Sequence, residues 1–132
     1  MPVARQIIEP NNERLNVSRN FNLPHSPGIR AGDFIFLSGM LSTDPSTGER
    51  SPGTMAHETR QTLTNMRHLL ESAGSSLERV VKLNVLIYDR IEYDALNRVY
   101  RQYVPKGPPA RTVWSVRIVD AFKVQLDAIA LA

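Results

Sequence analysis

The side chains best suited to chemistry gather in the stretch 109–132. Two alternating apolar and polar runs flank a short polar break there, a pattern that predicts a β-hairpin. Because side chains alternate between the two faces of a strand, the pattern assigns Arg111 in the first run and Gln125 and Asp127 in the second to polar faces. The opposite faces are apolar and include Trp114. We therefore expect Arg111 and Gln125 to share a polar surface that faces something other than the core, with Trp114 packed inside.

Other reactive residue types give weaker signals. The chain has no cysteine, which excludes disulfides, thiolate metal sites and a cysteine nucleophile. His57 and His68 lie off the apolar stripe of a predicted helix without a third ligand nearby, so we interpret them as surface residues rather than metal ligands. The acidic and hydroxyl residues of 43–49 match no calcium loop, and the proline and glycine among them favour a surface turn. No metal site is predicted.

Length, composition and charge restrict the class of protein. A chain of 132 residues fits a single domain, 1–132, with a core of its own. It has neither an apolar run long enough to span a membrane nor the pattern of a secretory signal, so we expect a cytoplasmic protein with no membrane partner. The net charge is +3, and basic residues are scattered among acidic ones. Because nucleic-acid binders more often present a basic stripe or stacked aromatics, no nucleic-acid partner is expected.

Strands are predicted on both sides of an irregular N-terminal segment. Residues 1–9 indicate a short strand, and 10–27 a loop long enough to suggest a function. A turn at 31–33 leads into Phe34–Leu37, a short apolar run that predicts a strand buried on both faces. Residues 80–88 predict a further strong strand.

Two helices separate these strands. The first spans 54–73; Ser51 or Thr54 can cap its start, and Gly74 stands where a left-handed residue would end it. The second spans 89–103 and is ended by prolines. Their apolar stripes consist of Thr59, Leu63, Met66, Leu70 and Ala73 in the first helix, and of Tyr93, Leu96, Tyr100 and Tyr103 in the second.

The element order predicts an α+β fold, with a mixed sheet and both helices on one face. Two helices can cover only one side of a sheet of five or six strands. The other side would carry part of the 34–37 strand and the polar row, so we expect a homo-oligomer that buries it.

Several short motifs follow one another in a characteristic order along the chain. They are Gly32-Asp33 with Leu37-Ser38-Gly39, Thr47-Gly48-Glu49, Gln61-Thr62-Leu63-Thr64-Asn65, Val80-Val81-Lys82, Tyr93 through Asn97 to Tyr100, Pro109-Ala110-Arg111, and Asp127-Ala128-Ile129-Ala130. In this order and spacing the chain resembles the Rid family (reactive intermediate deaminase, or YjgF), from about Gly32 to Ala130.

The resemblance implies a chorismate-mutase-like α+β fold that assembles as a homotrimer, with ligand pockets at the subunit interfaces. It implies hydrolysis of reactive enamines or imines to 2-oxo acids and ammonia, without metal or cofactor. Arg111 would bind the substrate carboxylate, a task that suits a bidentate guanidinium better than a lysine. Ser38 and the backbone at Gly39 and Val113 would line the same pocket. Asn97 falls on a family-typical helix position, where a structural role is the alternative.

Three positions depart from the family's pattern. The catalytic glutamate falls on Gln125, the pocket tyrosine on His25, and a common cysteine on Val113. A neutral amide can position a water molecule, but it cannot accept a proton as a carboxylate can. His25 or Asp127 could take over the proton transfer; the alternatives are a surface histidine and an ion-paired aspartate.

Two hypotheses follow. The first is a trimeric enzyme acting on a small imine or enamine carboxylate, with Arg111 binding the carboxylate and with Gln125 and His25 orienting water or substrate. The second is a non-catalytic Rid-like protein that binds a small carboxylic acid in a regulatory or scavenging role, which Gln125 favours. Ribonuclease activity is associated with some family members, but this sequence does not support it, because it shows neither a nucleophile–base set nor a basic groove.

Overall fold

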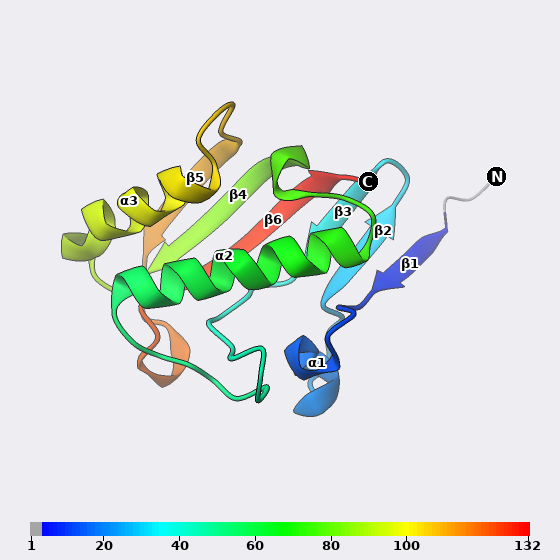
Figure 1. Ribbon diagram of the computed structural model, residues 1–132, viewed down its shortest axis with the longest axis horizontal. Helices are drawn as coiled ribbons and strands as arrows, with labels where there is room; N and C mark the ends of the chain where they lie inside the picture. Colours follow the sequence, from blue (N-terminus) through cyan, green and yellow to red (C-terminus); the bar gives the residue numbers. More distant parts are fainter. Residues whose placement is uncertain (1–3) are drawn as a thin grey trace.

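A six-stranded mixed sheet forms the body of the computed structural model, which describes residues 4–132 (Figure 1). The strands are β1 (Arg5–Ile8), β2 (Gly28–Ala31), β3 (Phe34–Leu37), β4 (Val80–Ile87), β5 (Ala110–Ser115) and β6 (Val124–Leu131), and the helices are α1 (Val17–Asn20), α2 (Met55–Ser72) and α3 (Tyr93–Tyr103). The sheet order is β1-β2-β3-β6-β4-β5, and only the β4–β5 pair is parallel. Helices α2 and α3 lie on the same side of the sheet, which confirms the predicted α+β class.

Helix α2 forms as its sequence predicts. The Thr54 hydroxyl caps it by accepting a hydrogen bond from the His57 backbone N–H at 3.1 Å. At the other end Gly74 adopts a left-handed φ of 80°, and its N–H donates to the Glu71 carbonyl. The predicted stripe lies against the sheet, with Thr59, Leu63, Met66 and Leu70 all buried.

Helix α3 starts four residues later than predicted. The chain first makes a 3₁₀ turn at Arg90–Glu92, which the Asp89 side chain caps by accepting from the Ile91 N–H. The α-helix then runs from Tyr93, and it buries Leu96 and Tyr100 as expected.

The predicted hairpin of the C-terminal region is wrong. β5 and β6 do not pair with each other; they flank β4, one parallel and one antiparallel to it. In a hairpin the two strands would be hydrogen-bonded to each other. Here the segment that connects β5 to β6 is hydrogen-bonded at both of its ends to the end of β4. The Val116 N–H donates to the Ile87 carbonyl, and the Tyr88 N–H donates to the Lys123 carbonyl.

The register on β4 also corrects the predicted faces. Arg111 lies opposite Leu83, a buried residue on the helix-covered face. Gln125 and Trp114 both lie opposite Leu86, which is three positions beyond Leu83. Because side chains alternate along a strand, this odd spacing puts Leu86, Gln125 and Trp114 on the open face. Trp114 is 45% exposed there rather than packed in the core. Arg111 and Gln125 therefore lie on opposite sides of the sheet.

The strand predicted to be buried on both faces is buried on only one in the single chain. In β3, Ile35 and Leu37 are buried under the helices, whereas Phe34 and Phe36 are 42% and 44% exposed. The open face of the sheet thus carries large aromatic side chains, namely Phe34, Phe36 and Trp114.

The N-terminal segment is ordered around short elements. Of the predicted strand 1–9, β1 occupies Arg5–Ile8, and residues 1–3 lie outside the described residues. The predicted loop 10–27 contains a 3₁₀ turn and α1. It is attached to α2 where the Asn12 N–H donates to His68 Nε2 at 3.0 Å. His68 is therefore a half-buried acceptor rather than a plain surface residue.

A buried carboxylate joins the first turn of α2 to the start of β6. Glu58 is fully buried; its Oε1 accepts from the Lys123 N–H at 2.8 Å, and its Oε2 accepts from the Gly53 N–H at 3.1 Å. The Lys123 ammonium lies 3.9 Å from the same carboxylate. These contacts fix the strand end next to Gln125.

Glu58→Ala should lower the free energy of unfolding by about 3 kcal/mol, because hydrogen bonds to a charged group contribute about 1.5–3 kcal/mol each and two partly buried N–H groups would lose their acceptor. Urea unfolding measures the change. Glu71→Ala, an exposed site on the same helix, is the control and should stay within about 0.5 kcal/mol of wild type. A loss below about 1 kcal/mol in Glu58→Ala would contradict this role.

Candidate functional site

The largest group of predicted site residues lines a cavity of about 210 Å³ beside the N-terminal segment. His25, Ser38 and Gly39 belong to its lining. Most of the remaining wall is apolar, with Leu15, Val17, Phe21, Leu23, Met40, Leu41 and Leu69. The long loop predicted to be functional therefore provides one wall of the cavity.

The end of β3 brings Gly39 against Gln125. Beyond Gly39 the chain pairs once more with β6: the Met40 N–H donates to the Leu126 carbonyl at 2.7 Å, and the Leu126 N–H donates back at 3.1 Å. A Cβ atom on Gly39 would clash with the Gln125 amide, with Cδ only 3.1 Å away. The absence of a side chain at Gly39 therefore lets the Gln125 amide lie over the backbone.

His25 and Ser38 are each held by a hydrogen bond. His25 Nδ1 lies 2.8 Å from the hydroxyl of Ser18, a buried residue of α1. The Ser38 hydroxyl donates to the Ser26 carbonyl at 2.6 Å. Ser18 also lines the cavity, and sequence reasoning missed it because nothing local relates it to His25.

Arg111 and Val113 form a second group, away from this cavity. Arg111 projects from β5 toward α3, where its Nη2 donates to the Tyr93 hydroxyl at 3.0 Å. The guanidinium carbon lies 5.7 Å from the centre of the Tyr93 ring and 4.8 Å from that of Tyr100. Val113 lies opposite Val85 and thus shares the helix-side face with Arg111.

The two phenol groups beside Arg111 have pKa values shifted in opposite directions. A hydrogen bond from Asn97, and then the charge of Arg111, lower the pKa of Tyr93. Burial raises the pKa of Tyr100, against a smaller opposing effect of Arg111. Asn97 thus contacts the arginine's phenol partner, although sequence reasoning left its role open between site and structure.

Asp127 lies on the open face beside Gln125. Its Oδ1 accepts a hydrogen bond from the Asn84 amide at 2.9 Å. No ion pair involves Asp127 within residues 4–132. Its observed partner is an amide rather than the arginine or lysine of the ion-pair alternative.

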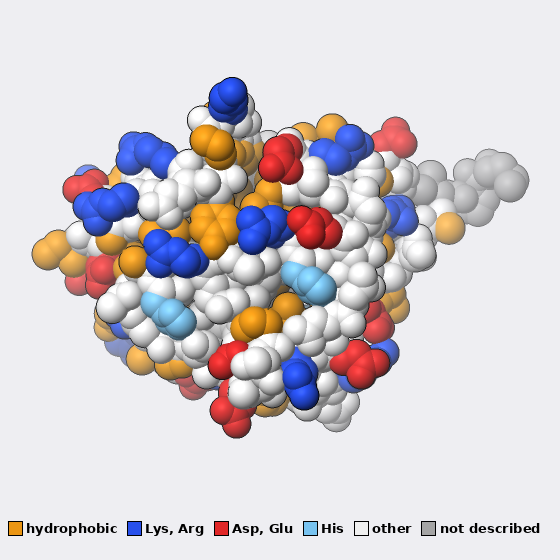
Figure 2. Space-filling view, viewed as in Figure 1, with side chains coloured by type: hydrophobic (Ala, Val, Ile, Leu, Met, Phe, Trp, Pro, Cys, Tyr) orange, Lys and Arg blue, Asp and Glu red, His pale blue; other side chains and the backbone are white. Residues whose placement is uncertain are grey.

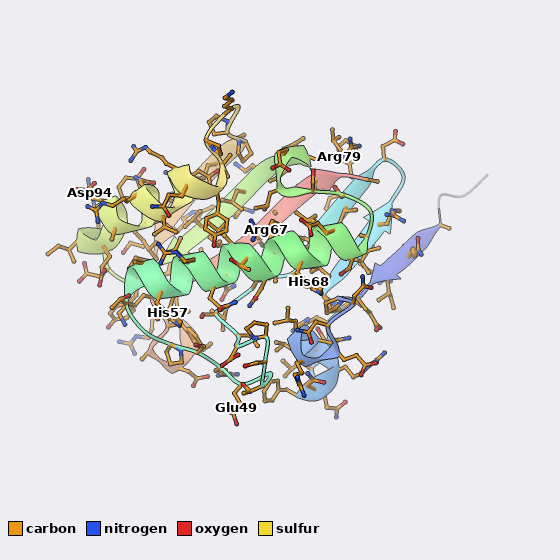
Figure 3. All side chains as sticks on the ribbon, viewed as in Figure 1. Glu49, His57, Arg67, His68, Arg79 and Asp94 are labelled. Carbon is orange, nitrogen blue, oxygen red and sulfur yellow. The ribbon has the colours of Figure 1, made fainter. Side chains whose placement is uncertain are left out.

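Nothing in the described part of the chain gathers three or more potential metal ligands. His57 and His68 lie at separate positions along α2 (Figure 3). Basic and acidic side chains are interspersed over the helix-covered side rather than segregated into a basic stripe (Figure 2). Among residues 4–132, no helix is long and apolar enough to cross a bilayer.

Comparison with known sequences settles the family. The profile of the family described as Endoribonuclease L-PSP matches residues 19–132. The chain belongs to this family, which includes the Rid and YjgF proteins. It is 38% identical over 108 residues to a RutC family protein of Pyrococcus horikoshii, covering 81% of this chain and 86% of the relative. It is 36% identical over 109 residues to the 2-iminobutanoate/2-iminopropanoate deaminase of Capra hircus, covering 82% and 80%.

Solved Rid structures share the fold. The Rid family protein YyfA of Yersinia pestis, a protein of unknown function, superposes with a TM-score of 0.88 at 25% identity, over 98% of this chain and all of that one. TdcF of Escherichia coli, solved with bound serine, gives a TM-score of 0.77 at 29% identity over 83% of this chain and 89% of its own.

Gly39→Ala should displace the Gln125 amide at little cost in stability, because the clashing atoms are the far end of a flexible side chain. We expect the free energy of unfolding to fall by no more than about 1.5 kcal/mol, the cost of an off-rotamer side chain. In the Gln125→Ala background the same substitution should cost nothing, so the two effects are coupled in a double-mutant cycle. Equal costs of Gly39→Ala in the two backgrounds would show that the two residues do not interact.

Proposed function

We propose that this Rid protein is a cofactor-independent deaminase that hydrolyses a small imine or enamine carboxylate to a 2-oxo acid and ammonia. The state of Arg111 carries the proposal. Arg111 is a partly buried residue, and its one hydrogen-bond partner among residues 4–132 is a phenol rather than a carboxylate. An arginine has five N–H donors, so enough remain for a bidentate grip on a substrate carboxylate. The deaminases among the relatives act on substrates of this class by their names.

The complete site would combine two copies of the chain. Arg111 lies on the helix-covered side of the sheet, and Gln125 lies on the open side. A homotrimer with pockets between subunits would place Arg111 and Val113 of one copy near His25, Ser38, Gly39 and Gln125 of another. The exposed Phe34, Phe36 and Trp114 support this assembly, since aromatic patches of this kind mark association surfaces.

In this pocket Gln125 and His25 would orient water or substrate. The Gln125 amide offers both donors and an acceptor. Ser18 holds one nitrogen of the His25 ring at 2.8 Å, which fixes the orientation of the imidazole. A cytoplasmic location is part of the same proposal.

A second candidate is a non-catalytic protein that binds a small carboxylic acid at the same pocket, in a regulatory or scavenging role. Gln125 favours it, because an amide cannot serve as a general base and such a base typically contributes a rate factor of about 10² to 10⁴. Arg111 would serve both candidates equally.

The enzyme hypothesis is tested with 2-iminobutanoate or 2-iminopropanoate generated in situ. Wild type should accelerate the decay of the imine. Arg111→Ala should lower kcat/KM by about 100-fold or more, because two charge-assisted hydrogen bonds of about 1.5–3 kcal/mol each are lost. Arg98→Ala, an exposed arginine on α3, is the control and should behave as wild type.

Gln125→Glu separates the two candidates. If wild type is inactive and Gln125→Glu accelerates decay strongly, the protein is a binder built on a catalytic scaffold. If neither protein accelerates decay, the carboxylate pocket has no support for these substrates. If wild type is active and Arg111→Ala matches it, the pocket is not formed around Arg111.

The assembly is tested by sedimentation. Wild type should sediment at three times the mass of one chain, and the double substitution Phe34→Asp/Phe36→Asp should give monomers, because it places charges on the surface to be buried. Ile91→Asp is the control: Ile91 is 84% exposed in the 3₁₀ turn that precedes α3, and its substitution should not affect assembly. A monomeric wild-type protein would refute the trimer.

A further inference from the structure

We propose that the Tyr93 hydroxyl transfers protons to and from the substrate held by Arg111. The inference rests on the proposed function and assigns the proton transfer, which the amide of Gln125 cannot perform, to a tyrosine. Its basis is the contact between phenol and guanidinium on the helix-covered side of the sheet.

The geometry places the phenol next to the reacting atoms. The Tyr93 oxygen lies 3.0 Å from Arg111 Nη2. In a 2-imino acid the imine carbon is bonded directly to the carboxylate. A carboxylate bound to the remaining N–H groups of Arg111 would therefore bring the imine carbon and nitrogen close to the Tyr93 oxygen. Tyr93 is 37% exposed, so a substrate can reach it.

The other candidate proton-transfer groups of the same chain lie elsewhere. Gln125 and Asp127 are on the opposite side of the sheet, and His25 is in the cavity of the N-terminal segment. Tyr100 also faces Arg111, but it is buried, and its hydroxyl has no hydrogen-bond partner among residues 4–132. Its ring serves as a wall against the guanidinium rather than as a proton donor.

The electrostatic surroundings of Tyr93 suit proton exchange. The groups that act on it are Asn97 and Arg101 from α3 and Arg111 from β5, and all three lower its pKa. Each stabilises the phenolate, by hydrogen bonding or by positive charge. A phenol whose pKa is lowered gives up its proton more readily than a free tyrosine, and so is a stronger general acid.

The proposed reaction balances in two halves. First, the phenol gives its proton to the imine nitrogen while water adds to the imine carbon; the phenolate then takes a proton from the added water, which leaves a carbinolamine and the restored phenol. Second, the phenol protonates the amino group as the C–N bond breaks, and the phenolate takes the hydroxyl proton as the C=O bond forms. The products are a 2-oxo acid and ammonia, and no redox partner is needed.

Tyr93→Phe tests the assignment, because it removes the hydroxyl and keeps the ring. We expect kcat for imine hydrolysis to fall by about 10² to 10⁴, the usual contribution of general acid–base catalysis. The Kd of the product 2-oxobutanoate should change by less than about twofold, because Arg111 and both aromatic rings remain. The fall in wild-type kcat/KM at alkaline pH, as the phenol loses its proton, should be absent from Tyr93→Phe.

Tyr103→Phe is the matched control, a phenol of the same helix that contacts Thr64 instead of Arg111. It should keep wild-type kcat. Full activity of Tyr93→Phe in an otherwise active protein overturns the inference and leaves the deaminase proposal standing. Parallel losses of kcat and product binding would make Tyr93 a binding residue and also overturn it. An inactive wild type refutes both proposals together.

Discussion

The alternation of side chains along β4 is the constraint on which the whole site depends. β4 lies between β5 and β6, so its register fixes which face each flanking strand presents. Leu83 faces the helices and aligns with Arg111, whereas Leu86 faces the open side and aligns with Gln125. Because neighbouring positions on a strand point in opposite directions, this odd offset separates the two residues by the thickness of the sheet. A pocket that uses both must draw on two copies of the chain.

Arg111 also shows how the fold keeps a partly buried cation that has no ion pair among residues 4–132. Two tyrosine rings of α3 flank the guanidinium, and the Tyr93 oxygen accepts a hydrogen bond from it. Cation–π contacts contribute about 0.5–2 kcal/mol and, unlike a carboxylate partner, leave the positive charge unneutralised. The positive charge thus stays available to an anionic ligand. Within one chain the same contacts place the guanidinium beside helix α3 rather than beside the cavity of the N-terminal segment.

The features that the sequence predicted correctly are local ones. The apolar stripe of α2, its Thr54 cap and the left-handed Gly74 are encoded within a few residues of one another. The turn at Gly32, with a φ of 58°, and the strands on either side of it follow from the same short-range signals. The order of short motifs likewise identified the family that the profile match establishes.

The sequence by itself determined the helices, most of the strands and the chemical identities of the site residues, because periodicity and capping act over neighbouring positions. Only the tertiary structure decided which strands pair, which faces Arg111, Gln125 and Trp114 occupy, and that Tyr93 meets the arginine. Strand pairing joins residues far apart in the chain. A register shift of a single residue reverses every face of a strand, and the local pattern of β5 and β6 does not encode that register.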